Sequence, residues 1–427
     1  MPLDTKTFVS TRRESSKPVP RSPRAGPASR WLAQKLYEGA GRPAVRLRLW
    51  DGTELGAATE AAVACLVIHD RGTLLRLLAY PELYFGEAYM HGRLDVEGDL
   101  IRCLETFKLA RASVRDRSLT TRLRDRMLTR RRRNTPDGSR SNIHHHYDLG
   151  NDFYRLWLDR AAMQYTCAYF PRAEASLEEA QVAKLDHICR KLRLQPGESV
   201  VEAGSGWGGL ARHMARHYGV RVKAFNISTE QVAFAREQAR AEGLEDRVTF
   251  IEDDYRNVAG TCDKFVSVGM LEHVGTKQYP DMAEAIDRVL KPNGRGLIHT
   301  IGCNRYDGPM NAWIEKRIFP GAHPPSLREM MDLFEHRDFS VLDVENLRLH
   351  YAATLRCWLQ RFEQHLDEVR AMFDESFVRA WRLYLSGCMA AFTTGETQLF
   401  QVVFARATCN DLPLTRDHIY PSGSEER

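Results

Sequence analysis

The segment from Val200 to Leu210 constrains the fold of this chain more than any other. It reads VVEAGSGWGGL and leads into a helical pattern. A short β-branched run that ends in an acid, then a cluster of glycines, then a helix predict a strand, a tight turn and a helix. Gly204 and Gly206 allow the backbone to approach a ligand, and Gly209 is expected to let the helix pack closely on the strand. The helix N-terminus then offers N–H groups to a carboxylate or a phosphate.

This segment alone leaves the ligand open, because such turns bind NAD, FAD or S-adenosylmethionine and also serve packing. The residues that follow add four strand patterns that alternate with helices, which predicts an α/β fold with an open parallel sheet. These strands are expected at 221–226, 247–253, 264–269 and 295–301, with helices at 228–241 and before a stop at 291–294. Ligands lie beyond the carboxyl ends of such strands. Polar residues at or just past those ends are Asn226, Asp254, Tyr255, Glu272 and His299.

Composition narrows the class of protein. With 427 residues, 43% of them hydrophobic, the chain can bury a large core and is expected to form two domains. No run approaches eighteen apolar residues and the N-terminus lacks a hydrophobic segment, so we expect neither a membrane span nor a secretory signal, and a cytoplasmic location. Nine cysteines without C-x-x-C pairs argue against disulfides and against structural zinc.

Charge and composition also suggest boundaries. Residues 12–30 are basic and rich in proline and serine, which is typical of disorder. Valine and leucine at 45, 47 and 49 alternate with arginine before Asp51-Gly52, which predicts a hairpin in a small antiparallel sheet. An apolar, partly helical pattern follows from Leu74 to Phe107, broken at Pro81, Gly86, Gly92 and Gly98. The expected parts are a disordered basic tail (1–30), an α+β domain (31–110), an arginine-rich linker (111–140), a large α/β domain (141–406) and a C-terminal tail (407–427).

The linker is the most basic part of the chain. Between Arg122 and Arg133 it carries seven positive charges against one negative charge. Such a segment is either a solvated helix face or a site of attraction to phosphate groups, on lipid or on nucleic acid. Charge alone does not choose between these readings.

Two further segments invite chemical interpretation. His144, His145 and His146 suggest a metal, but adjacent residues point in different directions and no carboxylate at a suitable spacing follows, so no metal site is expected. The segment from Tyr165 to Phe170 is dense in aromatic residues. Aromatic faces suit a sulfonium cation, although a buried core explains them equally well.

Taken together, the motifs resemble those of the cyclopropane-fatty-acyl-phospholipid synthases, relatives of the mycolic acid cyclopropane synthases. The resemblance runs from about residue 75 to residue 406, through seven motifs in the same order. They are HYDLGNDFY (146–154), QYTCAYF (164–170), EAGSGWGG (202–209), GMLEHVG (269–275), LIHTIG (297–302), WIEKRIFPG (313–321) and QLFQVVF (398–404).

The resemblance implies an S-adenosylmethionine-dependent (Rossmann-like) methyltransferase domain with a smaller N-terminal α+β domain for lipid binding or interaction. Such an enzyme transfers the methyl group to a cis double bond of an acyl chain in membrane phospholipid and closes a cyclopropane ring. It would work at an anionic phospholipid surface, peripherally on the inner face of the membrane, and a homodimer is a further expectation. In the family a bound bicarbonate is thought to act as base. The residues that correspond to its site are Cys167, Glu272, His299 and Tyr351, with Cys388 nearby.

The cofactor contacts carry over in the same way. Tyr165 and Thr166 correspond to residues at the methionine part, Gly204 and Gly206 to the loop under it, Asn226 and Gln231 to the ribose neighbourhood, and Asp254 and Tyr255 to the adenine pocket. Asn226 stands where dinucleotide folds usually have an acid, and Thr166 replaces a more usual serine. Gln231 has a competing interpretation, because Ser228 to Gln231 also forms a capping-box pattern.

Three alternatives remain. A nucleic-acid methyltransferase would suit the arginines. Such an enzyme is expected to have an Asn-Pro-Pro-Tyr motif or a nucleophilic Pro-Cys, and the sequence has neither, so no nucleic-acid partner is expected. A lipid-binding protein without catalysis would be expected to have a broken glycine loop or to lack Glu272 or His299, and neither applies. A fatty-acid methyltransferase that leaves a methyl or methylene branch is not separated from a cyclopropane synthase by sequence.

Overall fold

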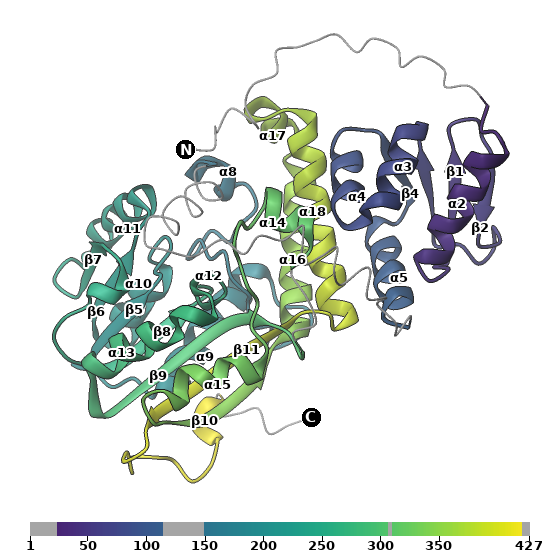
Figure 1. The fold of residues 1–427 in the computed structure, drawn as a ribbon. Helices are drawn as coiled ribbons and strands as arrows, with labels where there is room; N and C mark the ends of the chain where they lie inside the picture. The colour runs from purple at the N-terminus through teal and green to yellow at the C-terminus, as the bar shows by residue number, and fades with distance from the viewer. Residues whose placement is uncertain (1–23, 114–148, 306–309, 421–427) are drawn as a thin grey trace. The chain divides into compact units, whose positions relative to one another are not determined.

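The computed structural model describes residues 24–113, 149–305 and 310–420 (Figure 1). The chain divides into two compact units that do not follow the order of the sequence. The N-terminal unit comprises Met1–Arg131, Gly308–Pro320 and Leu355–Glu396, and the Rossmann-like unit comprises Arg132–Asp307, Gly321–Thr354 and Thr397–Arg427. Most of the expected linker at 111–140 and the three histidines at 144–146 lie outside the described residues.

The N-terminal unit contains a four-stranded sheet in the order β2-β1-β3-β4 and a group of helices. Its first part has α2 (Pro27–Gly39), β1 (Val45–Leu49), β2 (Glu54–Gly56), β3 (Ala64–Ile68), α3 (Arg71–Ala79), α4 (Pro81–Met90), β4 (Leu94–Gly98) and α5 (Leu100–Ser113). Later segments add α14 (Ala312–Arg317), the larger part of α16 (Arg348–Gln364), α17 (Leu366–Met372) and α18 (Glu375–Thr394).

Two predictions for the first part of this unit need correction. The predicted hairpin is confirmed, but the sheet is mixed rather than antiparallel, because β3 pairs with β1 in parallel. Strand β2 ends beside the start of β1, so β3 begins at that same end of β1, on its other side. The predicted disorder is wrong for residues 27–30, because α2 begins at Pro27, and the fixed φ of proline suits a first helical turn.

Gly86 does not break the helical pattern but lies inside α4. A Cβ atom at this position would collide with the indole ring of Trp313 on α14. The missing side chain therefore lets a large aromatic residue pack directly on the backbone of α4.

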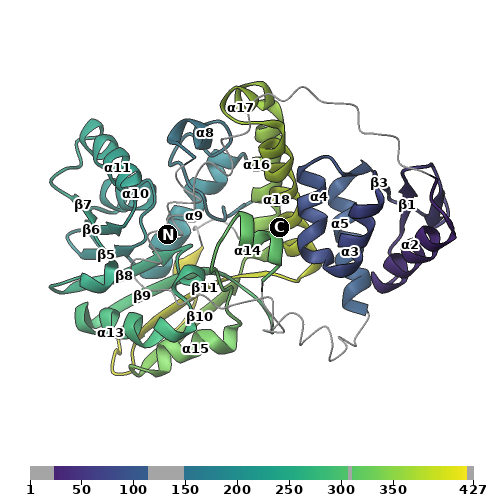
Figure 2. The ribbon, with the colours of Figure 1, turned by 45° about the horizontal axis from the view of Figure 1, so that its top comes forward.

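The Rossmann-like unit is built on a seven-stranded sheet in the order β10-β11-β9-β8-β5-β6-β7 (Figures 1 and 2). Its strands are β5 (Ser199–Ala203), β6 (Arg221–Asn226), β7 (Val248–Glu252), β8 (Cys262–Val268), β9 (Leu290–Gly302), β10 (Phe339–Asn346) and β11 (Gln398–Arg406). Its helices are α8 (Asn151–Arg155), α9 (Leu177–Leu192), α10 (Gly209–Tyr218), α11 (Thr229–Ala241), α12 (Leu271–Val274), α13 (Tyr279–Val289), α15 (Leu327–Glu335), the start of α16 and the short 3-10 helices η1 (Tyr255–Asn257), η2 (Thr276–Gln278) and η3 (Asp417–Ile419).

Helices cover both faces of this sheet. Helices α9, α10 and α11 bury one face through a core that includes Ile188, Met214 and Val232. Helices α13 and α15 bury the other face, where Phe265 and Phe334 belong to a second core. The strand order reverses between β5 and β8, so the topological switch point that binds ligands in such folds lies beside the glycine loop.

The predicted parallel strands are confirmed, but the sheet is larger than the sequence indicated. Strands β10 and β11 extend it, and β11 runs antiparallel to both neighbours. The helix expected to close at 291–294 ends at Val289, and Leu290 already belongs to β9. Pro292 favours extended backbone in the residue before it, which accounts for the earlier end.

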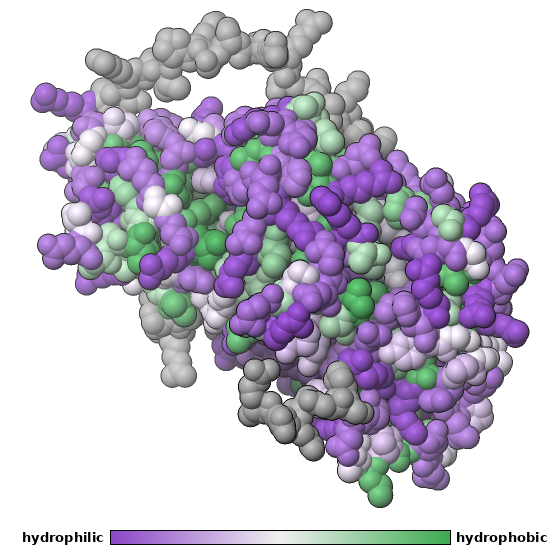
Figure 3. Space-filling model, turned by 180° about the vertical axis from the view of Figure 1, so that it is seen from behind, coloured by the Kyte–Doolittle hydropathy of each residue, from purple (hydrophilic) through white to green (hydrophobic). Residues whose placement is uncertain are grey.

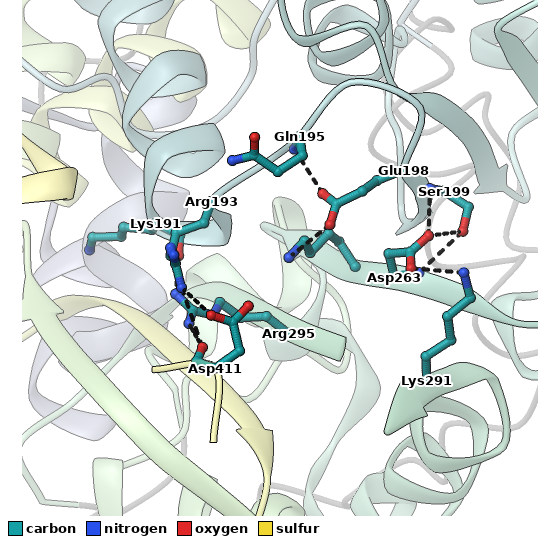
Figure 4. A network of polar contacts seen from close by, with 10 residues as sticks. Lys191, Arg193, Gln195, Glu198, Ser199, Asp263, Lys291, Arg295 and Asp411 are labelled. Carbon is teal, nitrogen blue, oxygen red and sulfur yellow. Dashed lines mark hydrogen bonds and ion pairs between the residues drawn. The ribbon is translucent and has the colours of Figure 1, made fainter. Parts of the chain in front are cut away.

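A polar network fixes the opposite, amino-terminal edge of the same sheet (Figure 4). The carboxylate of Asp263 at the start of β8 accepts hydrogen bonds from the backbone and hydroxyl of Ser199 at 2.9 and 2.7 Å and from Lys291 at 2.8 Å. Burial opposes ionisation of Asp263, but these bonds outweigh it and lower its pKa to about 2. The network thus ties the starts of β5, β8 and β9 together.

The surface drawn in Figure 3 is dominated by hydrophilic side chains, with apolar ones in small groups. Among the helices that the structure describes, none has the length and apolar character needed to cross a bilayer.

Candidate active site

The glycine loop between β5 and α10 has the backbone that its glycines permit. Gly204, Gly206 and Gly208 have φ angles of 81°, 53° and 78°, which is left-handed backbone that other residues rarely adopt. A Cβ atom at Gly206 would meet nothing within 4 Å, whereas one at Gly204 would touch Met270 at 3.1 Å. Gly206 therefore borders open space, as a loop beneath a ligand must.

Gly209 has a different role from the one predicted. A Cβ atom here would meet the carbonyl oxygen of Ala162 and the amide of Gln164, and not the strand. The glycine therefore allows the segment that carries Tyr165 and Thr166 to approach the start of α10. The glycine that close packing requires in this loop is Gly208, because a Cβ atom there would lie 2.5 Å from Phe250.

A cavity of about 80 Å³ opens at the carboxyl ends of β5, β6 and β7. Four of the predicted cofactor residues line it, namely Gly204, Asn226, Asp254 and Tyr255. Residues that the sequence did not single out also line it, among them Met270, His273 and Gln278. Burial lowers the pKa of His273 to about 4, so this wall of the cavity presents a neutral imidazole.

Asn226 holds the loop through its side chain. Its amide nitrogen donates to the carbonyl of Gly206 at 3.1 Å and to Oε1 of Gln231 at 2.8 Å, and its amide oxygen accepts from the backbone of Ser228 at 3.2 Å. The capping box is therefore half formed, because Ser228 caps α11 while the Gln231 side chain turns to Asn226. Within the described residues, the buried Nε2 of Gln231 has no hydrogen-bond partner and is a free donor.

Asp254 and Tyr255 lie in the turn after β7. Asp254 caps η1 and forms a two-point contact with Arg256, at 2.8 Å to Nε and 2.6 Å to Nη2. Tyr255 is 9% exposed, and burial raises the pKa of its hydroxyl. This wall of the cavity is therefore an aromatic ring beside a carboxylate that a guanidinium already neutralises.

A buried lysine, Lys184, binds the segment that contains Tyr165 and Thr166. Nζ of Lys184 on α9 donates to Oε1 of Gln164 at 2.5 Å and to the hydroxyl of Thr166 at 3.0 Å. Burial lowers the pKa of Lys184 to about 8, with the charges of Asp159 and Glu202 opposing the shift. Asp159 in turn accepts the backbone N–H of Gln164 at 2.7 Å.

The aromatic residues around Tyr165 form a packed cluster. Its ring centroid lies 5.5 Å from that of Tyr154 and 5.2 Å from that of Trp157. Tyr154 and Trp157 are fully buried, and Trp207 of the glycine loop joins them at 4.9 Å from Tyr154. Core packing therefore accounts for these partners, and Tyr165 is the partly exposed member.

Glu272 lies at the start of α12 with its carboxylate buried. It accepts from the hydroxyl of Thr300 at 2.7 Å and from the backbone of Ile301 at 3.2 Å. Burial raises the pKa of Glu272, and these two hydrogen bonds oppose the shift only in part. Glu272 has no hydrogen bond to His299 among these contacts, because its partners are the next two residues of β9.

Gln401 of β11 orients His299 instead. The two residues face each other across the strand pair, and Nε2 of Gln401 donates to Nδ1 of His299 at 3.1 Å. The proton of the neutral ring then lies on Nε2, which is buried and has no partner among the described residues. Burial, reinforced by the charges of Lys184 and Lys191, lowers the pKa of His299 well below its usual value, so the ring stays neutral.

Cys167 and Tyr351 meet at one backbone group. The thiol of Cys167 lies 4.0 Å from the carbonyl oxygen of Leu347, which also accepts the N–H of Tyr351 at 3.2 Å. Burial raises the pKa of Cys167, so it is a neutral thiol and no nucleophile.

Backbone contacts connect these residues to one another. Leu347 donates to the carbonyl of Leu399, two residues before Gln401, at 2.8 Å, and Gly269 donates to the carbonyl of His299 at 2.8 Å. A Cβ atom at Gly269 would lie 2.8 Å from the methyl group of Thr166. Cys167, Glu272, His299 and Tyr351 therefore gather at one edge of the sheet. Cys388 lies on α18 in the N-terminal unit, where burial raises its pKa to about 12.

Sequence reasoning missed the supporting residues Lys184, Asp159, Thr300 and Gln401. Lys184 gave no signal, because a lysine in an amphipathic helix is usually solvated. Gln401 did give one, as a single polar residue in the apolar run LFQVVF.

Models of two families match this chain. The model described as mycolic acid cyclopropane synthetase matches residues 134–402, and a domain of unknown function (DUF7884) matches residues 33–117. The chain is 36% identical to a probable fatty acid methyltransferase of Pseudomonas putida over 388 residues, which cover 88% of this chain and 96% of that protein. It is 44% identical to the cyclopropane-fatty-acyl-phospholipid synthase of Escherichia coli K12 over 271 residues, which cover 64% of this chain and 69% of that protein.

A solved structure of the same kind resembles the Rossmann-like unit. The crystal structure of mycolic acid cyclopropane synthase CmaA1 complexed with SAH and CTAB matches with a TM-score of 0.59 at 29% identity. The match covers 62% of this chain and 97% of that one. S-adenosylhomocysteine, the SAH of that complex, is what remains of S-adenosylmethionine after methyl transfer.

Proposed function

Since the chain belongs to the mycolic acid cyclopropane synthetase family and is an S-adenosylmethionine-dependent methyltransferase, we propose that it makes cyclopropane fatty acids on membrane phospholipid. The substrate is a cis double bond of an unsaturated acyl chain. The π electrons of the alkene attack the methyl carbon of S-adenosylmethionine, the carbon–sulfur bond breaks, and S-adenosylhomocysteine leaves. A proton is then lost from the transferred methyl group as the ring closes.

An alkene is a weak nucleophile, so the site must hold the methyl group in line with it and keep water out. The cluster formed by Cys167, Glu272, His299 and Tyr351 supports this task, because its polar groups are almost wholly buried. In the proposal Tyr165, Thr166, Gly204 and Gly206 surround the methionine part of the cofactor. Asn226, Gln231, Asp254 and Tyr255 surround its nucleoside.

The observation that carries the proposal is the unpaired donor on His299. A buried N–H without a partner costs about 1–3 kcal/mol, so such a group points to a ligand that accepts from it. Gln401 fixes the proton on Nε2 and thereby makes the ring a donor. A small anion is a ligand that suits a buried donor at the sheet edge where Glu272 also lies.

Bicarbonate meets this description. The residues that would hold it are Cys167, Glu272, His299 and Tyr351, with Cys388 as a further candidate, and its chemistry would be that of a base for the departing proton. Burial favours the protonated form of Glu272, in which it donates a hydrogen bond to an anion. The neutral ring of His299 donates through Nε2.

The substrate also sets the location. Acyl chains of phospholipids lie in a bilayer, so we propose a cytoplasmic enzyme that associates peripherally with the anionic inner face of the membrane. The basic residues between 122 and 133 support attraction to such a surface. We propose a homodimer as its assembly, and residues 31–110 as a domain for lipid binding or interaction.

One related activity has a specific observation in its favour. One relative that matches over nearly its whole length is named a probable fatty acid methyltransferase, and a branched product without a ring is the alternative that we propose. A methylene branch arises from the same cation when a hydride first shifts from the methyl-bearing carbon to the cationic carbon and the methyl group then loses its proton. The two products are isomers, so mass alone does not distinguish them.

Lipid analysis of cells that express the protein tests the proposal. Unsaturated acyl chains should gain one CH₂ each, in phospholipid, and the product should resist ozone because a cyclopropane has no double bond. A product of the same mass that ozone cleaves would identify a branched chain that keeps a double bond, and release of formaldehyde on cleavage would identify the methylene branch. Unchanged acyl chains, with a cofactor site that still binds S-adenosylmethionine, would overturn the phospholipid substrate.

A further inference from the structure

A cavity of about 440 Å³ lies within the N-terminal unit, between α3, α4 and the turn that leads to β4. It belongs to the region that matches the domain of unknown function. Six of its seven lining residues have polar side chains, and two of these are arginines. The polar lining residues are Thr73, Arg76, Tyr84, Glu87, His91 and Arg93.

The two arginines of this cavity carry uncompensated charge. Arg76 on α3 and Arg93 after α4 are exposed, and neither guanidinium has an acidic partner in the part of the chain that the structure describes. By contrast, Arg46, Arg48 and Arg111 of the same unit all pair with glutamates. Unpaired arginines that share a cavity are a site of positive potential.

The acid in the lining does not cancel this charge. Glu87 forms a two-point contact with Arg317, at 2.8 Å to each oxygen, and Lys316 lies 3.3 Å away. Burial opposes ionisation of Glu87, but Arg317 and Lys316 outweigh it and leave its pKa lowered. Glu87 is therefore an anion with two cationic partners, and the cavity stays positive overall.

The backbone holds these groups in place. Gly92 turns the chain with a φ of 65°, and the N–H of Arg93 donates to the carbonyl of Ala88 at 2.9 Å. The carbonyl of Arg93 accepts a hydrogen bond at 3.1 Å from the backbone N–H of His69, the residue that follows β3. On α3, Asp70 caps the helix by accepting from both the backbone and the hydroxyl of Thr73 at 2.8 Å. The carboxylate of Asp70 is therefore already hydrogen-bonded to Thr73, and the carbonyl of Ala88 in α4 already accepts a hydrogen bond from Arg93.

We propose that this cavity binds a phosphate group, carried by the head group of an anionic phospholipid or by a small phosphorylated solute. The planar fork of arginine matches phosphate oxygens in a two-point contact. The hydroxyl of Tyr84 and a ring N–H of His91 are further donors. The proposal rests on the residues of the N-terminal unit and stands apart from the reaction proposed above.

Titration of the full-length protein tests the site without turnover. The probes are inorganic phosphate, glycerophosphoglycerol, and vesicles of phosphatidylglycerol in phosphatidylcholine. The double variant Arg76→Gln/Arg93→Gln should bind the phosphate probes at least tenfold more weakly. Arg71→Gln is the matched control, because Arg71 is exposed on the same helix and does not line the cavity. S-adenosylmethionine binding, measured in parallel, reports that each variant is folded.

The outcomes separate the sources of phosphate. Loss of binding to both glycerophosphoglycerol and vesicles identifies a lipid head group, and loss for the small probes alone identifies a solute. Arg76→Lys keeps the charge but not the fork, so an intermediate loss is expected. The proposal is overturned if the double variant binds every probe as the wild type does, or if Arg71→Gln weakens binding equally. A folded protein that makes no cyclopropane would leave this result intact.

Discussion

At the scale of single residues, the candidate site depends on burial more than on close charge pairs. Glu272 and His299 belong to neighbouring positions of one sheet edge, and both have pKa values shifted by burial toward the neutral form. Each is held by partners on β9 or β11 and not by the other. A buried site whose groups are shifted toward their neutral forms suits a reaction that passes through a carbocation only if an anion joins them.

Replacing Glu272 with Gln should slow turnover with little effect on cofactor affinity. The amide keeps the shape and the hydrogen bond from Thr300 but cannot titrate, so we expect a loss of at least about tenfold, roughly 1.4 kcal/mol of barrier. Added bicarbonate should restore part of the rate if the anion still binds weakly. Product formation and titration with S-adenosylmethionine measure the two effects separately.

The pH profile gives a control for that variant. Because burial raises the pKa of Glu272, any dependence on its ionisation should fall above the usual glutamate range and be absent in the variant. Normal turnover would remove Glu272 from the mechanism. An equal loss of cofactor affinity would place it in the cofactor pocket.

Gln401 is expected to act through His299. Gln401→Leu removes the donor to Nδ1, so the ring can carry its proton on either nitrogen and turnover should fall by about tenfold to a hundredfold. Nitrogen NMR of His299 should show the change of tautomer. Gln398→Leu is the control, since Gln398 lies on the same strand and binds Asn346 at 2.8 Å. Equal losses in both variants would show that β11 packing, and not the tautomer, matters.

At the scale of elements, the glycine loop separates ligand binding from folding. Gly206→Asp should abolish S-adenosylmethionine binding, because its carboxylate would fill the space above the loop and repel that of the ligand. Fold stability should change by about 1 kcal/mol, since the Cβ meets no atom and only the backbone is strained. Gly208→Ala should do the reverse and cost about 1–3 kcal/mol, because its Cβ would lie 2.5 Å from Phe250. Calorimetry of both variants measures binding and unfolding, and unchanged binding by Gly206→Asp would refute the loop assignment.

The opposite edge of the sheet should control stability in acid. Asp263→Asn removes a carboxylate that ties β5, β8 and β9 together, at an expected cost of about 1–2 kcal/mol near neutral pH. The folded-state pKa of about 2 lies below the unfolded value, so this stabilisation is present above about pH 4 and is lost as the pH falls toward 2. Urea unfolding at several pH values checks this, and a variant with the same deficit at pH 2 as at pH 7 would contradict it.

The elements also show how far the sequence alone reaches. Five strands, β5 to β9, and the glycine loop were predictable, because each strand has its own apolar run and the glycines mark the turn. Strand β11 was not, since the run LFQVVF does not reveal its direction or its neighbour. The role of Gly209 was missed because its contact, Ala162, is distant in the chain. The bonds of Lys184 to Gln164 and of Gln401 to His299 likewise join residues 20 and 102 positions apart.

At the scale of the whole molecule, our proposals assign different functions to the two units. The Rossmann-like unit contains the cofactor loop and four of the five predicted catalytic residues, while the fifth, Cys388, belongs to the N-terminal unit. Segments 308–320 and 355–396 also belong to that unit, although they lie far from it in sequence. The predicted order of separate domains along the chain therefore does not describe the compact units.

Membrane association should depend on the arginine-rich segment and on salt. Each basic residue near an anionic surface contributes about 1 kcal/mol, so replacing Arg130 to Arg133 with Gln should weaken vesicle binding by up to about 4 kcal/mol. The loss should be large for vesicles with phosphatidylglycerol, small for neutral ones, and reduced as salt screens the wild-type attraction. Sedimentation with both vesicle types at two salt concentrations measures it. These arginines act by charge alone, whereas the cavity of Arg76 and Arg93 acts by shape as well. The Arg130–Arg133 variant and the Arg76→Gln/Arg93→Gln variant should therefore have additive effects on binding to vesicles, while binding of glycerophosphoglycerol should respond only to the Arg76→Gln/Arg93→Gln variant. Equal losses on neutral and anionic vesicles would instead assign the segment a role in packing.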